Sequence, residues 1–153
     1  MEKQVKIIKA WEYEGRKCLV LWLGSHFCGY GETKLNEVSY SQEFGDYETS
    51  PESNISAHGG ITFAGKHDEL EGNPFDKDIW YFGFDCAHAG DYNDFGVTIS
   101  DKEGHKWTEE EVIKETEQMV NGIIEYEKVY NKYKKEFEKF KKEIKKIQDG
   151  KRN

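Results

Sequence analysis

The sequence predicts an α+β fold: a mainly antiparallel sheet of about five strands, covered on one face by the start of a long C-terminal helix. Short segments rich in β-branched and aromatic residues fill the first two thirds of the chain, and one uninterrupted helical pattern fills the last third. The 153 residues suffice for a single hydrophobic core. We therefore expect a β-rich domain over residues 1–106 and a helix over residues 107–150.

The first predicted element is a β-hairpin. Residues 5–13 and 17–23 have the composition of strands, and Glu14 and Gly15 form a turn signal between them. The second arm is apolar on both faces, which is typical of a strand that lies in the middle of a sheet. We therefore expect it to be a central strand.

The middle of the chain alternates between loop and strand. Residues 25–55 are punctuated by glycines and a proline, so we expect a loop with one or two short strands. Residues 61–64 indicate a short strand that the next glycine ends. Residues 79–84 are the most apolar run of the chain and indicate a buried strand. Residues 90–106 are expected to be loop, with a small strand at 97–99.

The helix has the clearest local signal. Thr108 as N-cap and Glu111 three residues on form a capping box, and the acidic first turn suits the positive end of the helix dipole. Apolar and aromatic residues then recur at alternating steps of four and three, which is the pattern of a heptad seam. These residues are Val112, Thr116, Met119, Ile123, Tyr126, Tyr130, Tyr133, Phe137, Phe140, Ile144 and Ile147. We expect the first turns to pack on the sheet.

Charge divides the chain into an acidic body and a basic tail. The net charge is −8, but residues 128–152 hold 11 Lys or Arg and 4 Asp or Glu, so this segment carries +7 and the remainder −15. An acidic body repels nucleic acid, which makes that partner unlikely. The basic tail is expected to rest on the acidic body of its own or a neighbouring chain, and nucleic acid is the weaker alternative for it.

The second half of the helix predicts self-association. Its seam is aromatic, and such a seam either extends into solvent or packs against another chain or back on the body. We expect a homo-oligomer through this helix. No apolar run reaches the roughly 20 residues of a membrane span, and the N-terminus has no secretory pattern. Three cysteines without a Cys-x-x-Cys pair favour reduced thiols, so we expect a cytoplasmic protein that binds no membrane.

Two aspartates and a histidine follow the most apolar predicted strand. Asp85, His88 and Asp91 are spaced three apart, so they share a face if the chain makes one helical turn there. Such a cluster offers an acid–base pair, with His88 and Asp85 as the catalytic candidates, or part of a divalent metal site made by His58, Asp85, His88 and Asp91. The structural alternative is that Asp85 caps a turn and His88 is a satisfied buried histidine.

A second motif opens the short strand before it. His58, Gly59 and Gly60 suggest a backbone that faces an anion with its N–H groups, or simply a tight turn, and Thr62 follows on the strand. Each motif places a histidine and glycines at the end of a strand, so neighbouring strands would bring both into one cleft. The other histidines, His26, His67 and His105, lie in polar or mixed segments and are expected to face solvent.

These two stretches resemble a family of small, largely uncharacterised proteins of bacteriophages and prophage-like elements. Members carry a His-Gly-Gly-(Ile/Leu)-Thr-(Phe/Tyr) motif and an aromatic strand of the form Trp-x-x-Gly-Phe-Asp-x-Ala-His-x-Gly-Asp. Here the motifs stand at residues 58–63 and 80–91, and the resemblance covers roughly residues 1–125. It implies a phage accessory protein that acts on its host or blocks a host defence, and it implies no particular chemistry.

Three functions remain open on the sequence. The first is binding of a small anionic or nucleotide-like ligand by His58, Gly59, Gly60, Thr62, His88 and Asp91. The second is a metal-dependent hydrolase that uses the same histidine and aspartate cluster, with a divalent metal ion as cofactor. The third is an inhibitor that docks on a host protein through its acidic body or its C-terminal helix.

Overall fold

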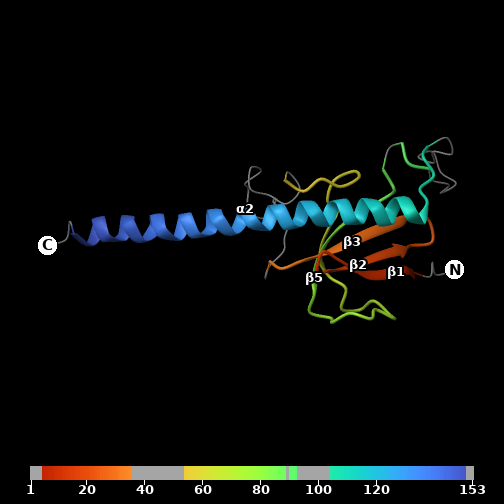
Figure 1. Ribbon diagram of the computed structural model, residues 1–153, viewed down its shortest axis with the longest axis horizontal. Helices are drawn as coiled ribbons and strands as arrows, with labels where there is room; N and C mark the ends of the chain where they lie inside the picture. Colours follow the sequence, from red (N-terminus) through yellow and green to blue (C-terminus); the bar gives the residue numbers. More distant parts are fainter. Residues whose placement is uncertain (1–4, 36–53, 89, 93–103, 151–153) are drawn as a thin grey trace.

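The computed structural model describes residues 5–35, 54–88, 90–92 and 104–150, and it confirms the predicted α+β fold (Figure 1). The described residues form a five-stranded antiparallel sheet in the order β1-β2-β3-β5-β4, and the first half of helix α2 crosses one face of it. The elements are β1 (Lys6–Tyr13), β2 (Arg16–Trp22), β3 (Phe27–Thr33), β4 (Phe63–Lys66), β5 (Trp80–Asp85) and α2 (Glu109–Gly150). No helix among these residues is both long and apolar enough to cross a bilayer.

The predicted hairpin is confirmed as β1 and β2. Glu14 and Gly15 both take positive φ angles, of 50° and 73°, which is the backbone of a tight turn between twisted strands. Strand β2 lies between β1 and β3, and its residues Cys18, Leu19 and Val20 are fully buried, as its apolar composition predicts.

Strand β3 is longer and more central than its glycine-rich sequence suggests. It pairs with β2 on one side and β5 on the other. Its glycines do not interrupt the strand. Their lack of a side chain lets helix α2 pack closely against it. A Cβ on Gly29 would lie 2.3 Å from Oγ1 of Thr116, and one on Gly31 would lie 2.6 Å from Cγ2 of Val120. The expected strand at 97–99 and residues 36–53 of the expected loop lie outside the described residues.

The bounds predicted for the short strand were wrong by two residues. Strand β4 begins at Phe63 and continues through Gly65, which was expected to end it. Gly65 pairs with Tyr81, so the glycine continues the strand instead of ending it. The buried strand predicted at 79–84 is confirmed as β5, which ends at Asp85.

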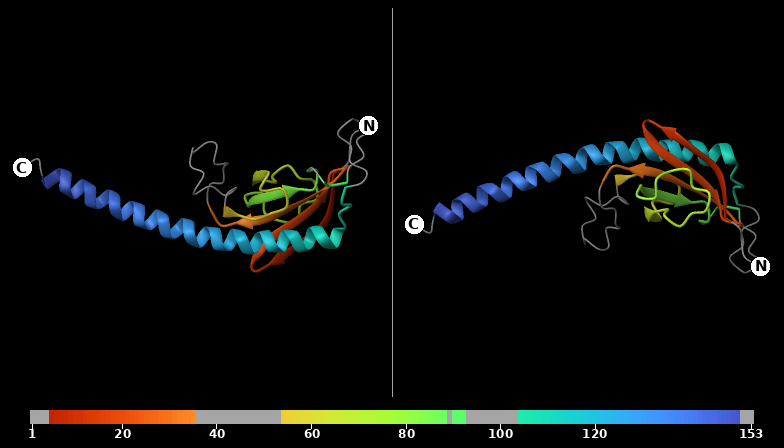
Figure 2. Two further views of the ribbon diagram at one scale, coloured as in Figure 1. Left: turned by 90° about the horizontal axis from the view of Figure 1, so that it is seen from above. Right: turned by 90° about the horizontal axis from the view of Figure 1, so that it is seen from below.

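Helix α2 starts as predicted. The amide N–H of Glu111 donates to Oγ1 of Thr108, and the amide N–H of Thr108 donates to the Glu111 carboxylate, so the capping box is formed. The seam residues of its first half, from Val112 to Tyr126, are buried against the sheet. Residues 128–150, here called the projecting half, extend beyond the sheet along a gentle curve (Figure 2).

A buried ion pair lies where the projecting half begins. Glu127 is 6% exposed, and its carboxylate accepts two hydrogen bonds of 2.7 Å from the Arg16 guanidinium. It also accepts from the Thr33 hydroxyl and the Lys34 amide. Strands β2 and β3 are thereby tied to one carboxylate of the helix, which fixes where the helix leaves the sheet.

The second face of the sheet is covered by the loop after β4, and here one expectation was wrong. His67 does not face solvent: its ring stacks on Phe63 at 4.8 Å and meets the edge of Tyr30 at 4.2 Å, and its Nε2 is buried. Burial lowers the pKa of His67, against a smaller opposite effect of Asp68. Aromatic neighbours from two strands draw the ring inward, which a polar local sequence cannot reveal.

Two glycine substitutions are expected to change stability in opposite directions. Gly29→Ala places a methyl group inside Thr116 and the Phe84 ring, so it should lower the free energy of unfolding by about 1–3 kcal/mol. Gly122→Ala, inside α2, meets only ordinary contacts with Ile55, so it should raise that free energy by about 0.5–1 kcal/mol through helix propensity. Urea unfolding followed by circular dichroism measures both. Equal effects would contradict the close packing of β3 on α2.

Candidate functional site

Two turns bring the motif residues together beside the start of α2 (Figure 1). In the first, the amide N–H of Gly60 donates to the carbonyl of Ala57 at 2.8 Å. In the second, directly after β5, the amide N–H of Asp91 donates to the carbonyl of His88 at 3.0 Å. The second turn continues into a backbone bridge between Asp91 and His105, which holds it against the segment that enters the helix.

Asp91 is the centre of the site. It is 2% exposed, and its carboxylate lies 2.7 and 2.8 Å from Nε2 of His58. It also accepts from the indole N–H of Trp107 at 2.9 Å and from the amide N–H of His88 at 2.9 Å. Burial alone would raise the pKa of Asp91, but these hydrogen bonds outweigh it and hold the pKa below its ordinary value. Asp91 is therefore an ionised anchor that joins both motifs to the helix entrance.

His88 is held less firmly than His58. Its Nε2 lies 3.1 Å from Oδ1 of Asp85 without a hydrogen bond to it, and this nitrogen has no hydrogen-bond partner among the described residues. Asp85 is engaged elsewhere, since the same oxygen accepts from the amide N–H of Ala87 at 3.0 Å. Asp85 therefore caps the turn, as one of the two interpretations of the sequence expected, and it also contacts His88.

Gly59 is required by the packing of the His88 ring. A Cβ there would lie 2.2 Å from Cδ2 and 2.3 Å from Nε2 of His88, and Gly59 has a φ of +69°, which disfavours any other residue. The first turn therefore lies directly on the histidine of the second.

The two motif histidines meet as a pair. The rings of His58 and His88, called the histidine pair below, lie 5.6 Å apart between centroids at an interplanar angle of 74°. Their side chains are 27% and 28% exposed. The His58 ring also lies 4.5 Å from the Trp107 ring. The sequence suggested that the two motifs could meet, and in the structure their histidine rings are in direct contact.

Some expected roles do not match the geometry. The amide N–H of Gly60 is used within its turn, and that of Thr62 donates to the carbonyl of Gly83 at 2.9 Å, so neither is left to face an anion. The candidate metal ligands, which are His58, Asp85, His88 and Asp91, form two separate histidine–carboxylate contacts. Within the described part of the chain, no three histidine, cysteine or acidic side chains are placed to hold one metal ion.

A pocket that the sequence did not predict adjoins the histidine pair. This aromatic pocket has a volume of about 250 Å³ and is lined by Trp22, Ser25, His26, Phe27, Cys86, Tyr92, Lys106 and Trp107. Trp107 belongs to both places, because its indole N–H is bonded to Asp91 while its ring lines the pocket. His26, expected to face solvent, is half-buried here, with Nδ1 2.8 Å from the Ser25 hydroxyl.

The pocket was missed because its residues come from three separate segments. Trp22 and Phe27 flank the turn between β2 and β3, where they are cross-strand partners in edge-to-face contact at 4.8 Å. Aromatic residues on both sides of that turn were the available signal. The Cys86 thiol at the pocket wall is 2% exposed, and burial raises its pKa, so it stays protonated and inert.

Comparisons with known proteins add no assignment: no family model, no curated protein and no solved structure matches this chain.

Proposed function

We propose that this protein binds a small anionic, nucleotide-like ligand at the histidine pair. The observation that carries the proposal is the direct contact of two partly exposed imidazoles, one from each motif. The buried carboxylate of Asp91 holds both residues, since it bonds the His58 ring and the His88 amide. A protonated imidazole has an N–H on each ring nitrogen, so His58 in that form donates to Asp91 and still offers an N–H to a phosphate or carboxylate ligand.

The two histidines have different parts in this proposal. His58 is fixed by its bonds to Asp91, so it offers its remaining ring edge in a constant direction. Nε2 of His88 has no hydrogen-bond partner among the described residues, so a ligand that reaches it displaces only its contact with Asp85. Asp91 and Gly59 position the pair rather than touch the ligand.

Calorimetric titration with inorganic phosphate and with AMP tests the proposal. We expect binding by the wild type and a loss of about tenfold or more in affinity in His58→Asn and His88→Asn, since each removes a donor to a charged group. Lys66→Met is the control, because Lys66 lies over the Trp80 ring, away from the histidine pair. No binding of either probe, or equal binding in all variants, would refute the proposal.

The biological setting we propose is that of a bacteriophage accessory protein in the host cytoplasm. The resemblance of both motifs to phage and prophage proteins supports it, and the three free, buried cysteines fit a reducing compartment. A small protein that binds nucleotide-like molecules would counter a host defence by removing its signal. Expression in a bacterium challenged with phage, comparing wild type with His88→Asn, tests this role.

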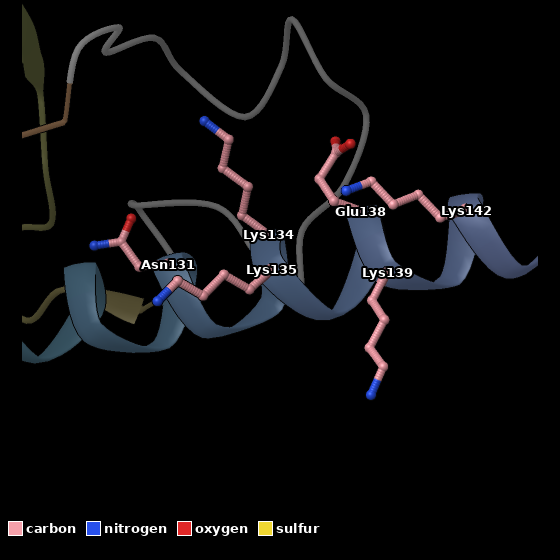
Figure 3. A pocket seen from close by; sticks show the side chains of 6 residues that line it. All are labelled: Asn131, Lys134, Lys135, Glu138, Lys139 and Lys142. Carbon is pink, nitrogen blue, oxygen red and sulfur yellow. The ribbon is translucent and has the colours of Figure 1, made fainter.

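We also propose that two chains associate through the projecting half of α2. There the seam is uncovered: Tyr133 is 60% exposed, Phe140 57% and Ile147 60%. The projecting half points away from the sheet of its own chain (Figures 1 and 2). An acidic surface that attracts its lysines is therefore expected to belong to another chain. Lysines lie around its surface, and Figure 3 shows Lys134 and Lys139 pointing to opposite sides of the helix.

Sedimentation across a concentration series tests the association. We expect the wild type to self-associate and the full-length Tyr133→Glu/Phe140→Glu variant to be a monomer, because charges at the seam cannot be buried. Lys139→Gln, which changes one of the outer lysines, should associate like the wild type. A wild type that stays monomeric over the whole series would remove the proposal.

A further inference from the structure

We propose that the aromatic pocket binds the base of a nucleoside monophosphate, whose phosphate group lies at the histidine pair. This inference rests on the proposed anion binding and extends it from an anion to a class of ligand. It assigns a binding role to Trp22, Phe27, Tyr92, Lys106 and Trp107, which lie outside both sequence motifs or at their edge.

The lining of the pocket suits a flat ring. Four of its walls are aromatic side chains, and every nucleobase has a face that stacks on such rings. Trp22 and Phe27 support each other edge to face, so their rings keep a fixed orientation. Trp107 is fixed too, because its indole N–H is bonded to the buried carboxylate of Asp91. Fixed rings lose little side-chain entropy when a ligand stacks on them.

The position of the pocket suits an anionic group on the same ligand. Trp107 forms part of its lining and lies 4.5 Å from the His58 ring, so the pocket and the histidine pair share a wall. The exposed Lys106 also lines the pocket, with its ammonium group 5.2 Å from the centre of the Tyr92 ring. A ligand whose ring fills the pocket thus lies near the Lys106 ammonium group at the edge of the pocket. The imidazoles of His58 and His88 lie on the other side of Trp107.

Size and charge select the monophosphate among nucleotides. The volume of about 250 Å³ is below the roughly 300–1,000 Å³ of pockets for drug-sized ligands, so it admits a base or a nucleoside but no second base. The chain carries a net charge of −8, concentrated in the body, and this field repels a triphosphate more than a monophosphate. Nucleic acid is repelled for the same reason.

Calorimetric titration with AMP, adenosine, inorganic phosphate and ATP tests the inference on the full chain. We expect AMP to bind most tightly of the four, and Trp22→Leu to weaken AMP by about tenfold or more while leaving phosphate unchanged. Lys106→Met should also weaken AMP. Its matched control is Lys66→Met, which removes a lysine that lies 4.9 Å over the Trp80 ring, outside the pocket, and should bind like the wild type.

The outcomes separate this inference from the proposed function. Phosphate bound in a His58-dependent way, with AMP no tighter than phosphate, would overturn the pocket assignment and leave the anion site standing. Adenosine bound as tightly as AMP and lost in Trp22→Leu would keep the ring site and overturn the phosphate at the histidine pair. The Lys106→Met variant guards against a folding artefact, because this side chain is at the surface and its loss leaves the core intact.

Discussion

Replacing Glu127 by alanine is expected to lower the free energy of unfolding by about 3–5 kcal/mol, because it leaves the Arg16 guanidinium buried without its carboxylate. The two side chains are 8% and 12% exposed, so water cannot replace the lost partner. The hydroxyl of Thr33 and the amide of Lys34 lose an acceptor in the same step. Denaturant unfolding of the full chain measures the loss.

Two further variants show whether the loss comes from the unpaired charge. Glu125→Ala removes a carboxylate two residues away that is 71% exposed and pairs with Lys128, so its unfolding midpoint should match the wild type. The double variant Arg16→Met/Glu127→Met removes both charges and should recover much of the stability. A Glu127→Ala variant as stable as Glu125→Ala would show that the ion pair does not anchor the helix.

The acid stability of the protein should depend on the same carboxylate. Burial alone would raise the pKa of Glu127, but its bonds to Arg16, Lys34 and Thr33 lower it below the ordinary 4.5. A carboxylate with a lowered pKa contributes stability that is fully present above its unfolded value and is lost as the pH falls through the folded value. Part of the acid unfolding below about pH 4.5 is therefore expected to come from Glu127.

Local patterns in the sequence predicted the elements because their causes are local. The capping box of Thr108 and Glu111 and the hairpin turn at Glu14 and Gly15 depend on residues at most three positions apart. The period of the helix seam follows from helix geometry, and it continues unchanged from the covered to the projecting half. The sequence could not tell where burial stops, since that is set by the edge of the sheet and by the pairing of Glu127 with Arg16, 111 positions away.

The sequence suggested that the two motifs meet, but it did not predict how their residues pair. The spacing of Asp85, His88 and Asp91 suggested one shared face, with His88 and Asp85 as an acid–base pair. Instead Asp91 holds His58 from the other motif, while Asp85 caps a turn and only contacts His88. Such a pairing depends on β4 and β5 being neighbours and on the turn at Gly59, which no spacing encodes. His67 and the aromatic pocket were missed because their partners also come from separate strands.

Replacing Asp91 by alanine should lower the free energy of unfolding by about 3 kcal/mol or more and disorder the site at the same time. The change leaves the Trp107 indole N–H, the His88 amide and the His58 ring without their shared acceptor, and each unpaired buried donor costs about 1–3 kcal/mol. His58→Ala is the matched comparison, since it removes one donor and leaves the hydrogen bonds from the Trp107 indole and the His88 amide to Asp91 in place. Its loss should be clearly smaller.

The pH dependence of Asp91→Ala gives a readout that packing loss alone would not change. The pKa of Asp91 lies below its ordinary 3.8, so its contribution is present above that pH and disappears as the pH falls through the lower folded value. The wild type should therefore lose stability more steeply than Asp91→Ala in this range, with Glu127 contributing equally to both. Parallel stability curves would mean that the pKa of Asp91 is the same in the folded and the unfolded chain, which would contradict its lowering by the site. A wild type that gains stability relative to Asp91→Ala as the pH falls would mean that the anchor of His58 and Trp107 is a neutral carboxyl, which donates one hydrogen bond and accepts less strongly than a carboxylate.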